Sequence, residues 1–207
     1  MTASKPIIGL CGGVGAGKSR VAEEFARQGC LVIDSDRVNH ELLRRPDVVA
    51  TLRQWWGDGI LGPDGLPDRR RIAEIVFADP VQKQRLEALM YPLIDALRGS
   101  MILKVDEDRA VKAIILDSPL LFESNLDRHC DAIVFVDAHR SHRLQRLQQT
   151  RGWSAAQLAA REQWQLPLAE KRSRSDFRVD NDGPPDRLPP QVHDILDRVL
   201  ARHAARQ

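Results

Sequence analysis

The chain alternates between short apolar runs and longer segments in which apolar residues recur every three or four positions. The runs occupy residues 7–11, 30–33, 111–116, 132–136 and 176–180, the last being the poorest. Near-continuous apolar runs of this length are typical of strands that are buried on both faces of a sheet. Helical segments between successive strands favour parallel strands joined by right-handed crossovers. The pattern therefore predicts an α/β protein with a five-stranded parallel sheet.

The first and last helices are predicted with defined ends. Four apolar residues after the first strand share one helix face, and Gly29 follows them as a C-terminal stop. Near the other end of the chain, Pro190 suits the first position of a helix. Its apolar residues fall at i, i+3, i+4, i+7 and i+8. They are Val192, Ile195, Leu196, Val199 and Leu200.

A glycine-rich motif follows the first strand. Residues 12–19 read GGVGAGKS, which fits the pattern G-x-x-x-x-G-K-[ST] between a predicted strand and a predicted helix. Glycines let consecutive N–H groups point at phosphate oxygens, and the helix N-terminus adds partial positive charge. In such a loop Lys18 reaches the β- and γ-phosphates and the Ser19 hydroxyl ligates Mg²⁺. A chance glycine-rich turn does not explain these flanks, so the motif predicts a nucleoside triphosphate site.

Several predicted strands end in aspartate. Asp34 and Asp36 follow the second strand, and Asp117 follows the third. Ligands of open parallel sheets bind outside the carboxyl ends of the strands, which makes these carboxylates candidates for chemistry. A kinase that acts on a hydroxyl needs a carboxylate to position it and accept its proton, a role open to Asp34 or Asp36. The alternative is that one of them caps the next helix. Asp117 is placed like the carboxylate that holds Mg²⁺ directly or through water.

A long helical insert separates the second and third strands. Residues 37–109 contain no obvious strand, and residues 69–77 are predicted to form a short helix. Residues 86–97 have helical spacing, and Pro92 within them predicts a kink or a boundary. Two interpretations of the insert remain open. It could bind the acceptor of a phosphoryl-transfer reaction, or it could serve packing alone.

Two arginine-rich helices are predicted after the fourth strand. The first spans residues 139–151, and Ser154 with Gln157 forms a capping box for the second, which Pro167 stops. The pair carries little core of its own. We expect it to form a lid over the phosphates, and an ordinary surface hairpin is the alternative.

Composition and charge restrict the class of protein and its expected partners. With 31 Lys+Arg against 29 Asp+Glu, the net charge is +2, so neither nucleic acid nor membrane is expected as a partner. Cys11, Cys30 and Cys130 lack metal-ligand spacing, and the first two are expected to be buried as small hydrophobes. No apolar stretch has signal-peptide or membrane-spanning length, so we expect a cytoplasmic protein. An N-K-x-D guanine motif does not occur, which disfavours a GTPase. The residues predict a small-molecule kinase.

Four further segments, together with the glycine-rich motif, resemble the dephospho-CoA kinase family. They read VIDSD at residues 32–36, PLLFE at 119–123, QLPLAEKRSRSD at 165–176 and DFRVDNDG at 176–183. Their order and spacing match the family from about residue 7 to residue 183. The PLLFE run, joined to the paired aspartates, is specific to that family. Kinases of shikimate, gluconate or nucleotides would share only the loop and an early aspartate, and a non-catalytic nucleotide sensor would not need Asp36.

The resemblance implies ATP-dependent phosphorylation of the ribose 3′-hydroxyl of dephospho-CoA, the last step of coenzyme A synthesis, with Mg²⁺ as cofactor. It also implies a single domain with the three-layer P-loop NTPase fold, as a monomer or small homo-oligomer. Its parts would be a core of about residues 6–36, 110–138 and 174–207, a helical acceptor-binding insert of about 37–109, and a helical lid of about 139–173.

Individual roles follow from motif position in this resemblance. Asp36 would be the base that faces the 3′-hydroxyl, while Lys18 and Arg146 would balance the charge of the phosphoryl group in transit. ATP would be bound by Gly13, Val14, Gly15, Ala16, Gly17, Lys18, Ser19 and Arg20. The acceptor would be bound by Asp34, Arg69, Phe77, Tyr91, Pro119 and Leu120. The lid would contribute Arg161 and Gln165, and Mg²⁺ would be held by Ser19 and Asp117.

The chain departs from the family pattern at a few positions. His40 stands where the family commonly has arginine, and Tyr91 stands where a histidine usually precedes the proline. Thr150 and Arg151 occur where a single arginine is usual. Which arginine of residues 140–151 meets the phosphates is left open by the sequence.

Overall fold

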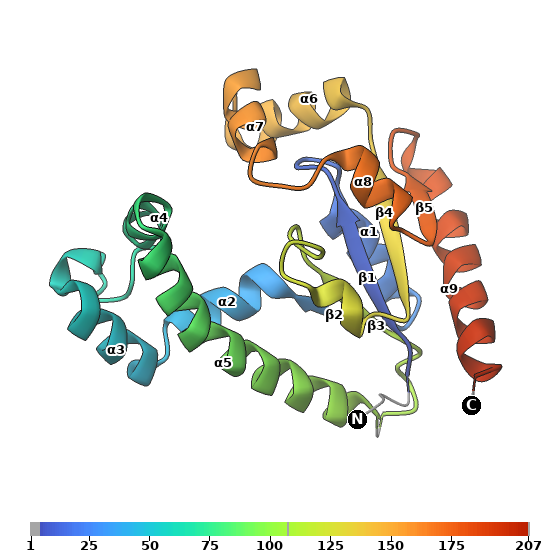
Figure 1. Cartoon of the computed structure of the whole chain (residues 1–207). Helices are drawn as coiled ribbons and strands as arrows, with labels where there is room; N and C mark the ends of the chain where they lie inside the picture. Colours follow the sequence, from blue (N-terminus) through green and yellow to red (C-terminus); the bar gives the residue numbers. More distant parts are fainter. Residues whose placement is uncertain (1–4, 107, 207) are drawn as a thin grey trace. The chain divides into compact units, whose positions relative to one another are not determined.

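Residues 5–106 and 108–206 are described by a computed structural model, and their centre is a single parallel sheet. The strands are β1 (Ile7–Gly12), β2 (Leu31–Asp34), β3 (Ile114–Asp117), β4 (Ala132–Asp137) and β5 (Phe177–Asp180). They lie in the order β2-β3-β1-β4-β5, and every neighbouring pair is parallel (Figure 1). The predicted five-stranded parallel sheet is confirmed.

The strand order places the end of β1 at the switch point of the sheet. From β1 the chain moves to β2 on one side, returns to β3, and then crosses β1 to reach β4 and β5. Ligands of open α/β sheets bind outside the carboxyl ends of strands at such a point. The loop that leaves β1 at Gly12 therefore emerges where a ligand is expected.

The chain divides into two compact units. The first comprises the described residues of Met1–Asp34 and Ile102–Gln207 and contains the whole sheet. The second is Ser35–Met101. The boundaries of the core, insert and lid stay predictions.

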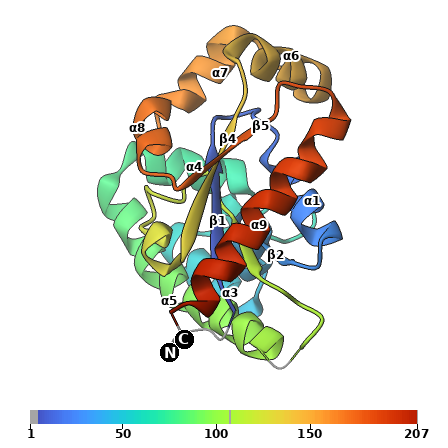
Figure 2. The ribbon, with the colours of Figure 1, turned by 90° about the vertical axis from the view of Figure 1, so that its right-hand side faces the viewer.

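Helices α1 (Lys18–Arg27) and α9 (Leu188–Ala204) cover one face of the sheet (Figure 2). Phe25 of α1 and Val192 of α9 are completely buried, in one apolar cluster with Ile8 of β1. Burying side chains of this size stabilises the fold by about 1.5–3 kcal/mol each. α1 ends as predicted, because Gly29 adopts a φ of 92° just beyond it.

The opposite face of the sheet is covered by segments that connect the strands. Leu121 and Phe122 pack there on Cys11 and Phe135, next to the short helix η2 (Leu126–His129). Helix α8 (Leu168–Ser173) contacts β1. Helices α6 (Arg140–Arg151) and α7 (Ala155–Glu162) complete the first unit. The three-layer arrangement agrees with the predicted fold class.

The second unit is helical throughout its regular structure. It contains α2 (Ser35–Leu43), α3 (Pro46–Trp56), η1 (Asp58–Ile60), α4 (Arg69–Ala78) and the part of α5 (Pro80–Asp106) up to Met101. α4 matches the predicted helix at residues 69–77. α5 runs through Pro92, so of the predicted kink or boundary the boundary is wrong, and the kink stays a prediction. Pro92 removes one i→i−4 hydrogen bond, and the helix continues on both sides of it.

Other predicted ends differ by a few residues. β3 starts at Ile114 rather than at residue 111, because Pro6 has no N–H with which β1 could extend the ladder. α9 starts at Leu188 and carries its two prolines in the first turn. η3 (Pro185–Arg187) precedes it. α8 was not predicted as a separate helix, since six residues are too few to show a helical period.

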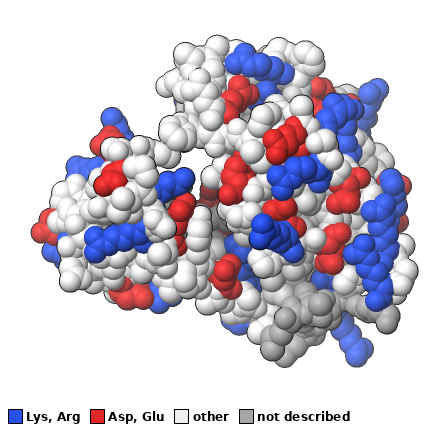
Figure 3. All heavy atoms as spheres, viewed as in Figure 1, with Lys and Arg blue, Asp and Glu red and all other residues white. Residues whose placement is uncertain are grey.

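Cys11 and Cys30 are buried as predicted, and all three cysteines are thiols. Burial raises the pKa of Cys30 to about 11, and burial also raises the pKa of Cys11. Both thiols are therefore protonated at neutral pH. Figure 3 shows basic and acidic side chains interspersed over the visible face. None of the described helices has the length and apolar character needed to cross a membrane.

Candidate phosphate-binding site

The loop between β1 and α1 is held in a conformation that requires glycine. Gly17, at the N-cap of α1, has a φ of 86°, in the left-handed region that other residues avoid. A Cβ atom on Gly17 would lie 2.2 Å from Nδ2 of Asn181. Within the loop, the Ala16 N–H donates to the Gly13 carbonyl. Lys18 and Ser19 then form the start of α1, so the predicted motif has its predicted strand–loop–helix context.

Side chains from elsewhere in the chain hold the loop by its carbonyl oxygens. Arg143 Nη1 donates to the Val14 carbonyl over 3.0 Å, and Arg146 Nη1 donates to the Ala16 carbonyl over 3.2 Å. Asn181 Nδ2 also donates to the Ala16 carbonyl, over 2.7 Å, and the Asn181 carbonyl accepts from Arg146. Peptide N–H groups that face a phosphate leave their carbonyls facing outward, where they need donors. These three side chains supply them.

Arg146 lies beside the loop, and its guanidinium donates to the carbonyls of Ala16 and Asn181. Its role towards the phosphoryl group stays a prediction. Arg143, Glu162 and Asn181 were missed. Arg143 lies in the arginine-rich run at 140–151 and Asn181 in the segment of resemblance at 176–183, whereas nothing in the sequence marked Glu162.

Asp34 and Asp117 are brought together at the carboxyl edge of the sheet. They are register partners on the neighbouring strands β2 and β3, and Asp117 also pairs with Leu10 of β1. Asp117 is buried, Asp34 is exposed, and both make polar interactions. Asp36 belongs to the second unit, where it lies in the first turn of α2.

The residues present fit a magnesium ion that is only partly held by protein. Ser19 offers a hydroxyl at the start of α1, and Asp117 offers a carboxylate on the strand beside β1. Groups of three or more His, Cys, Asp or Glu that could hold a metal do not occur among the described residues. Mg²⁺ commonly takes one or two protein oxygens and completes its shell with water and phosphate oxygens.

The segment at residues 119–123 is tied to the end of the predicted lid by a buried lysine. Lys171 is completely buried, and its Nζ lies 2.8 Å from Glu123 Oε1. The same ammonium donates to the Pro119 carbonyl and to Gln165 Oε1, each over 3.1 Å. Leu120 is exposed. Gln165, predicted to serve the lid, is therefore part of a buried network, whose lysine the sequence had not singled out.

The other predicted lid residue lies elsewhere. Arg161 is on α7, with its guanidinium 5.4 Å from the centre of the Trp153 ring. The predicted capping box of α7 is confirmed, because Ser154 and Gln157 make both of its hydrogen bonds. Whether α6 and α7 act as a lid stays a prediction.

The predicted acceptor residues of the second unit lie on α4 and α5. Arg69 is exposed at the first position of α4, and Phe77 and Tyr91 are also exposed. Partial burial raises the pKa of Tyr91, and the nearby carboxylate of Glu87 raises it further.

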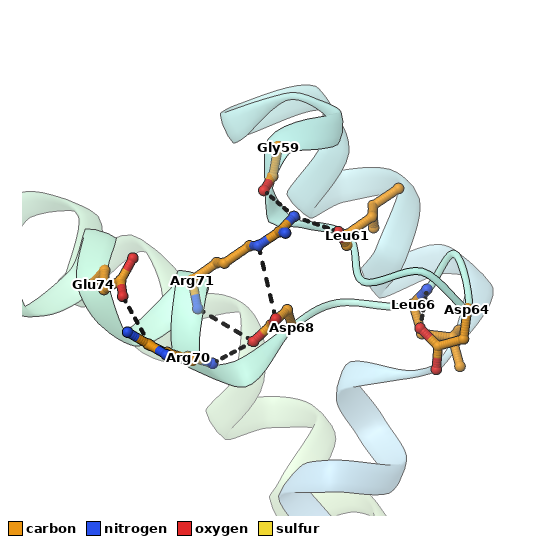
Figure 4. Close-up of polar contacts among 8 residues, drawn as sticks. All are labelled: Gly59, Leu61, Asp64, Leu66, Asp68, Arg70, Arg71 and Glu74. Carbon is orange, nitrogen blue, oxygen red and sulfur yellow. Dashed lines mark hydrogen bonds and ion pairs between the residues drawn. The ribbon is translucent and has the colours of Figure 1, made fainter.

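The neighbours of Arg69 are engaged in the unit's own structure. Arg70 pairs with Glu74, while Arg71 donates to the carbonyls of Gly59 and Leu61 (Figure 4). Asp68 caps α4 by accepting from the backbone of both arginines.

The sheet order and the glycine-rich loop between β1 and α1 are those of a P-loop protein. A family model described as dephospho-CoA kinase matches residues 6–186. The chain belongs to the dephospho-CoA kinase family. Its relatives include the dephospho-CoA kinases of Thermobifida fusca and Corynebacterium glutamicum, each of which is 33% identical to it. Each alignment covers 94% of this chain, and it covers 96% of the Thermobifida protein and 98% of the Corynebacterium protein.

Solved structures share the fold of this chain. The crystal structure of TT1252 from Thermus thermophilus has a TM-score of 0.82 and 29% identity, covering 94% of this chain and 97% of that one. The dephospho-CoA kinase from Campylobacter jejuni has a TM-score of 0.62 at 22% identity, covering 95% and 98%, and shares the fold.

Proposed function

We propose that this chain transfers the γ-phosphoryl group of ATP to the ribose 3′-hydroxyl of dephospho-CoA, giving coenzyme A and ADP. Membership of the dephospho-CoA kinase family is the observation that carries the proposal. The P-loop supports it independently, because a loop of this sequence and conformation binds the phosphates of a nucleoside triphosphate. Three free cysteines suit a reducing compartment, and we propose that the reaction takes place in the cytoplasm.

In the proposed reaction the O3′ oxygen forms a bond to the γ-phosphorus while the bond to the β,γ-bridging oxygen breaks. The hydroxyl proton passes to the carboxylate of Asp36, and ADP leaves. Phosphoryl transfer depends mainly on positioning and on charge stabilisation. Lys18 and Arg146 provide positive charge at the γ-phosphate. When bound, Mg²⁺ neutralises phosphate charge, and Ser19 and Asp117 are the residues that would hold it.

The acceptor is proposed to bind through exposed side chains of the second unit and through the first unit's Asp34 and 119–120 segment. Arg69 offers a guanidinium for the phosphates of dephospho-CoA, and Phe77 and Tyr91 offer aromatic surfaces for its adenine or pantetheine parts. α6 and α7 are proposed to close over the ATP and to exclude water, because water would otherwise compete as acceptor.

The test is an ATP-consumption assay across a panel of hydroxyl acceptors: dephospho-CoA, shikimate, gluconate and nucleoside monophosphates. The expected result is rapid ADP formation with dephospho-CoA and a new coenzyme A peak by liquid chromatography. The Lys18→Ala variant serves as the inactive control. Rapid turnover of another acceptor, with none of dephospho-CoA, would contradict the proposed function.

A further inference from the structure

The outer side of the P-loop carries a buried arginine. Arg143 of α6 is only 3% exposed, and its Nη1 donates both to the Val14 carbonyl and, over 2.7 Å, to Glu162 Oε1. Burying a guanidinium is unfavourable unless it is paired and hydrogen-bonded. Here the carboxylate on α7 supplies the opposite charge, and the loop carbonyl supplies the second acceptor.

The guanidinium also lies close to the backbone of the loop. A Cβ atom on Gly13 would lie 2.8 Å from Arg143 Nη1 and 3.0 Å from Cζ. A side chain at position 13 would therefore require the guanidinium to move. The guanidinium lies directly against the loop at Gly13.

The Arg143 guanidinium has one N–H that protein acceptors in the described part of the chain do not satisfy. Arg143 Nε is buried and has no hydrogen-bond partner among the residues that the structure describes. Arg143 lines a cavity of about 300 Å³ together with Gly13, Val14 and Glu162. Arg140 also lines it, with its Nη2 3.6 Å from Glu162 Oε2. One carboxylate thus sits between two arginines beside the P-loop.

We propose that Arg143 is a positioning residue for nucleotide binding, and that Glu162 on α7 acts through it. Arg143 holds the Val14 carbonyl outward, which keeps the adjoining N–H groups in the conformation that receives phosphate oxygens. Its positive charge on that carbonyl also polarises the peptide in the direction that favours an anion. Glu162 keeps the guanidinium in place. The inference rests on the proposed function only in taking ATP as the nucleotide.

The primary test is a calorimetric titration of Mg²⁺–ADP into the full chain, which measures the Kd for ADP. Arg143→Gln removes the charge-assisted hydrogen bond, and the Kd for ADP is expected to rise about tenfold. The matched control is Arg202→Gln, an exposed arginine of α9 with no proposed role in binding, whose Kd is expected to stay within about twofold of wild type. In steady-state assays KM for ATP rises in Arg143→Gln, while KM for dephospho-CoA does not. If Arg143 served stability alone, its replacement would not raise KM for ATP while leaving KM for dephospho-CoA unchanged.

Glu162→Gln provides the second arm. It is expected to raise the Kd for ADP about threefold, and the double variant is expected to bind no worse than Arg143→Gln, because the pair acts as one unit. If Arg143→Gln does not fold, Glu162→Gln alone decides. A folded Arg143→Gln variant with a Kd within twofold of wild type would overturn the proposal, as would unchanged binding in Glu162→Gln or multiplying losses in the double variant.

The two proposals fail separately. A wild-type chain that binds ADP but does not phosphorylate dephospho-CoA would end the proposed function. The role of Arg143 in nucleotide binding would stand.

Discussion

The side chains around the P-loop and those of the predicted acceptor region of the second unit differ in what they contact. Around the loop, Arg143 and Arg146 donate hydrogen bonds to backbone carbonyls of the loop. On α4 and α5, Phe77 is 57% exposed and Tyr91 is 47% exposed, and Arg69 is exposed as well. The loop is held by hydrogen bonds within the protein, whereas the predicted acceptor region presents its groups to solvent.

This difference separates two kinds of functional residue. A preorganised loop spends little free energy on ordering when phosphate binds, since its conformation already exists. Side chains that face solvent must be ordered by the ligand and lose rotamer freedom in doing so. Changes around the loop should therefore act on ATP, and changes on α4 should act on the acceptor.

The largest expected effect belongs to neither side, because Asp36 is proposed to act on the reacting hydroxyl. Asp36→Asn keeps the shape but removes the proton acceptor, so kcat is expected to fall by about 10²–10⁴-fold. The Kd for ADP should stay unchanged. Steady-state kinetics and calorimetry on the same preparation measure both quantities.

Asp34→Asn is the matched control for that experiment. A large loss of kcat in Asp34→Asn, with near-normal turnover in Asp36→Asn, would show that the two roles were exchanged. If Asp36 only stabilised α2, its change to Asn would cost about 1 kcal/mol or less and leave activity almost intact.

Lys18→Ala tests the loop itself. Loss of an ammonium that meets developing charge in the transition state is expected to lower kcat by about 10²–10³-fold. Lys112→Ala, at an exposed lysine before β3, is the control and should keep wild-type turnover. Near-normal turnover of Lys18→Ala at saturating ATP would refute the assignment of the loop.

Arg69→Ala tests the acceptor side. Removing its guanidinium is expected to raise KM for dephospho-CoA about tenfold, the size of one lost charge-assisted hydrogen bond, with KM for ATP unchanged. Arg70→Ala is the matched control, because Arg70 pairs with Glu74 at 3.2 Å and faces no proposed ligand. Equal changes in both variants would remove Arg69 from the acceptor site.

The smallest expected effect concerns the turn that follows β5. Burial raises the pKa of Asp182, but hydrogen bonds from His142 and from the His139 N–H outweigh it, so the net pKa is lowered. A carboxylate with a lowered folded pKa stabilises the protein above its unfolded pKa of about 4, and that stability is lost as pH falls further.

Asp182→Asn should therefore cost about 1 kcal/mol at pH 6, or roughly 2–4 °C in Tm. The Tm difference from wild type is expected to shrink towards pH 3. Thermal melts across that range measure it, and a difference that is independent of pH would contradict the role of the carboxylate.

The parts of this molecule that sequence predicted well are those specified by local pattern. Five apolar runs became the five strands, and the glycine loop, the Gly29 stop and the capping box of α7 all occur where expected. Each depends on residues within a few positions of one another.

The parts that sequence missed depend on contacts between distant positions. Arg143 and Val14 are 129 residues apart, and Asn181 and Ala16 are 165 apart. No period or motif in a single sequence records such a pairing. The burial of Lys171 against Glu123 was hidden for the same reason, since a lysine after Pro167 looks like a solvated surface residue.

The measurement that tests the contrast between the two regions most directly is hydrogen exchange of the wild-type chain with each ligand alone. ADP with Mg²⁺ is expected to protect residues 12–20 and α6, and to leave residues 69–91 unchanged. Dephospho-CoA alone is expected to protect residues 69–91, and both ligands together should add protection across residues 139–171. Protection of residues 12–20 by dephospho-CoA, with none at residues 69–91, would contradict the account.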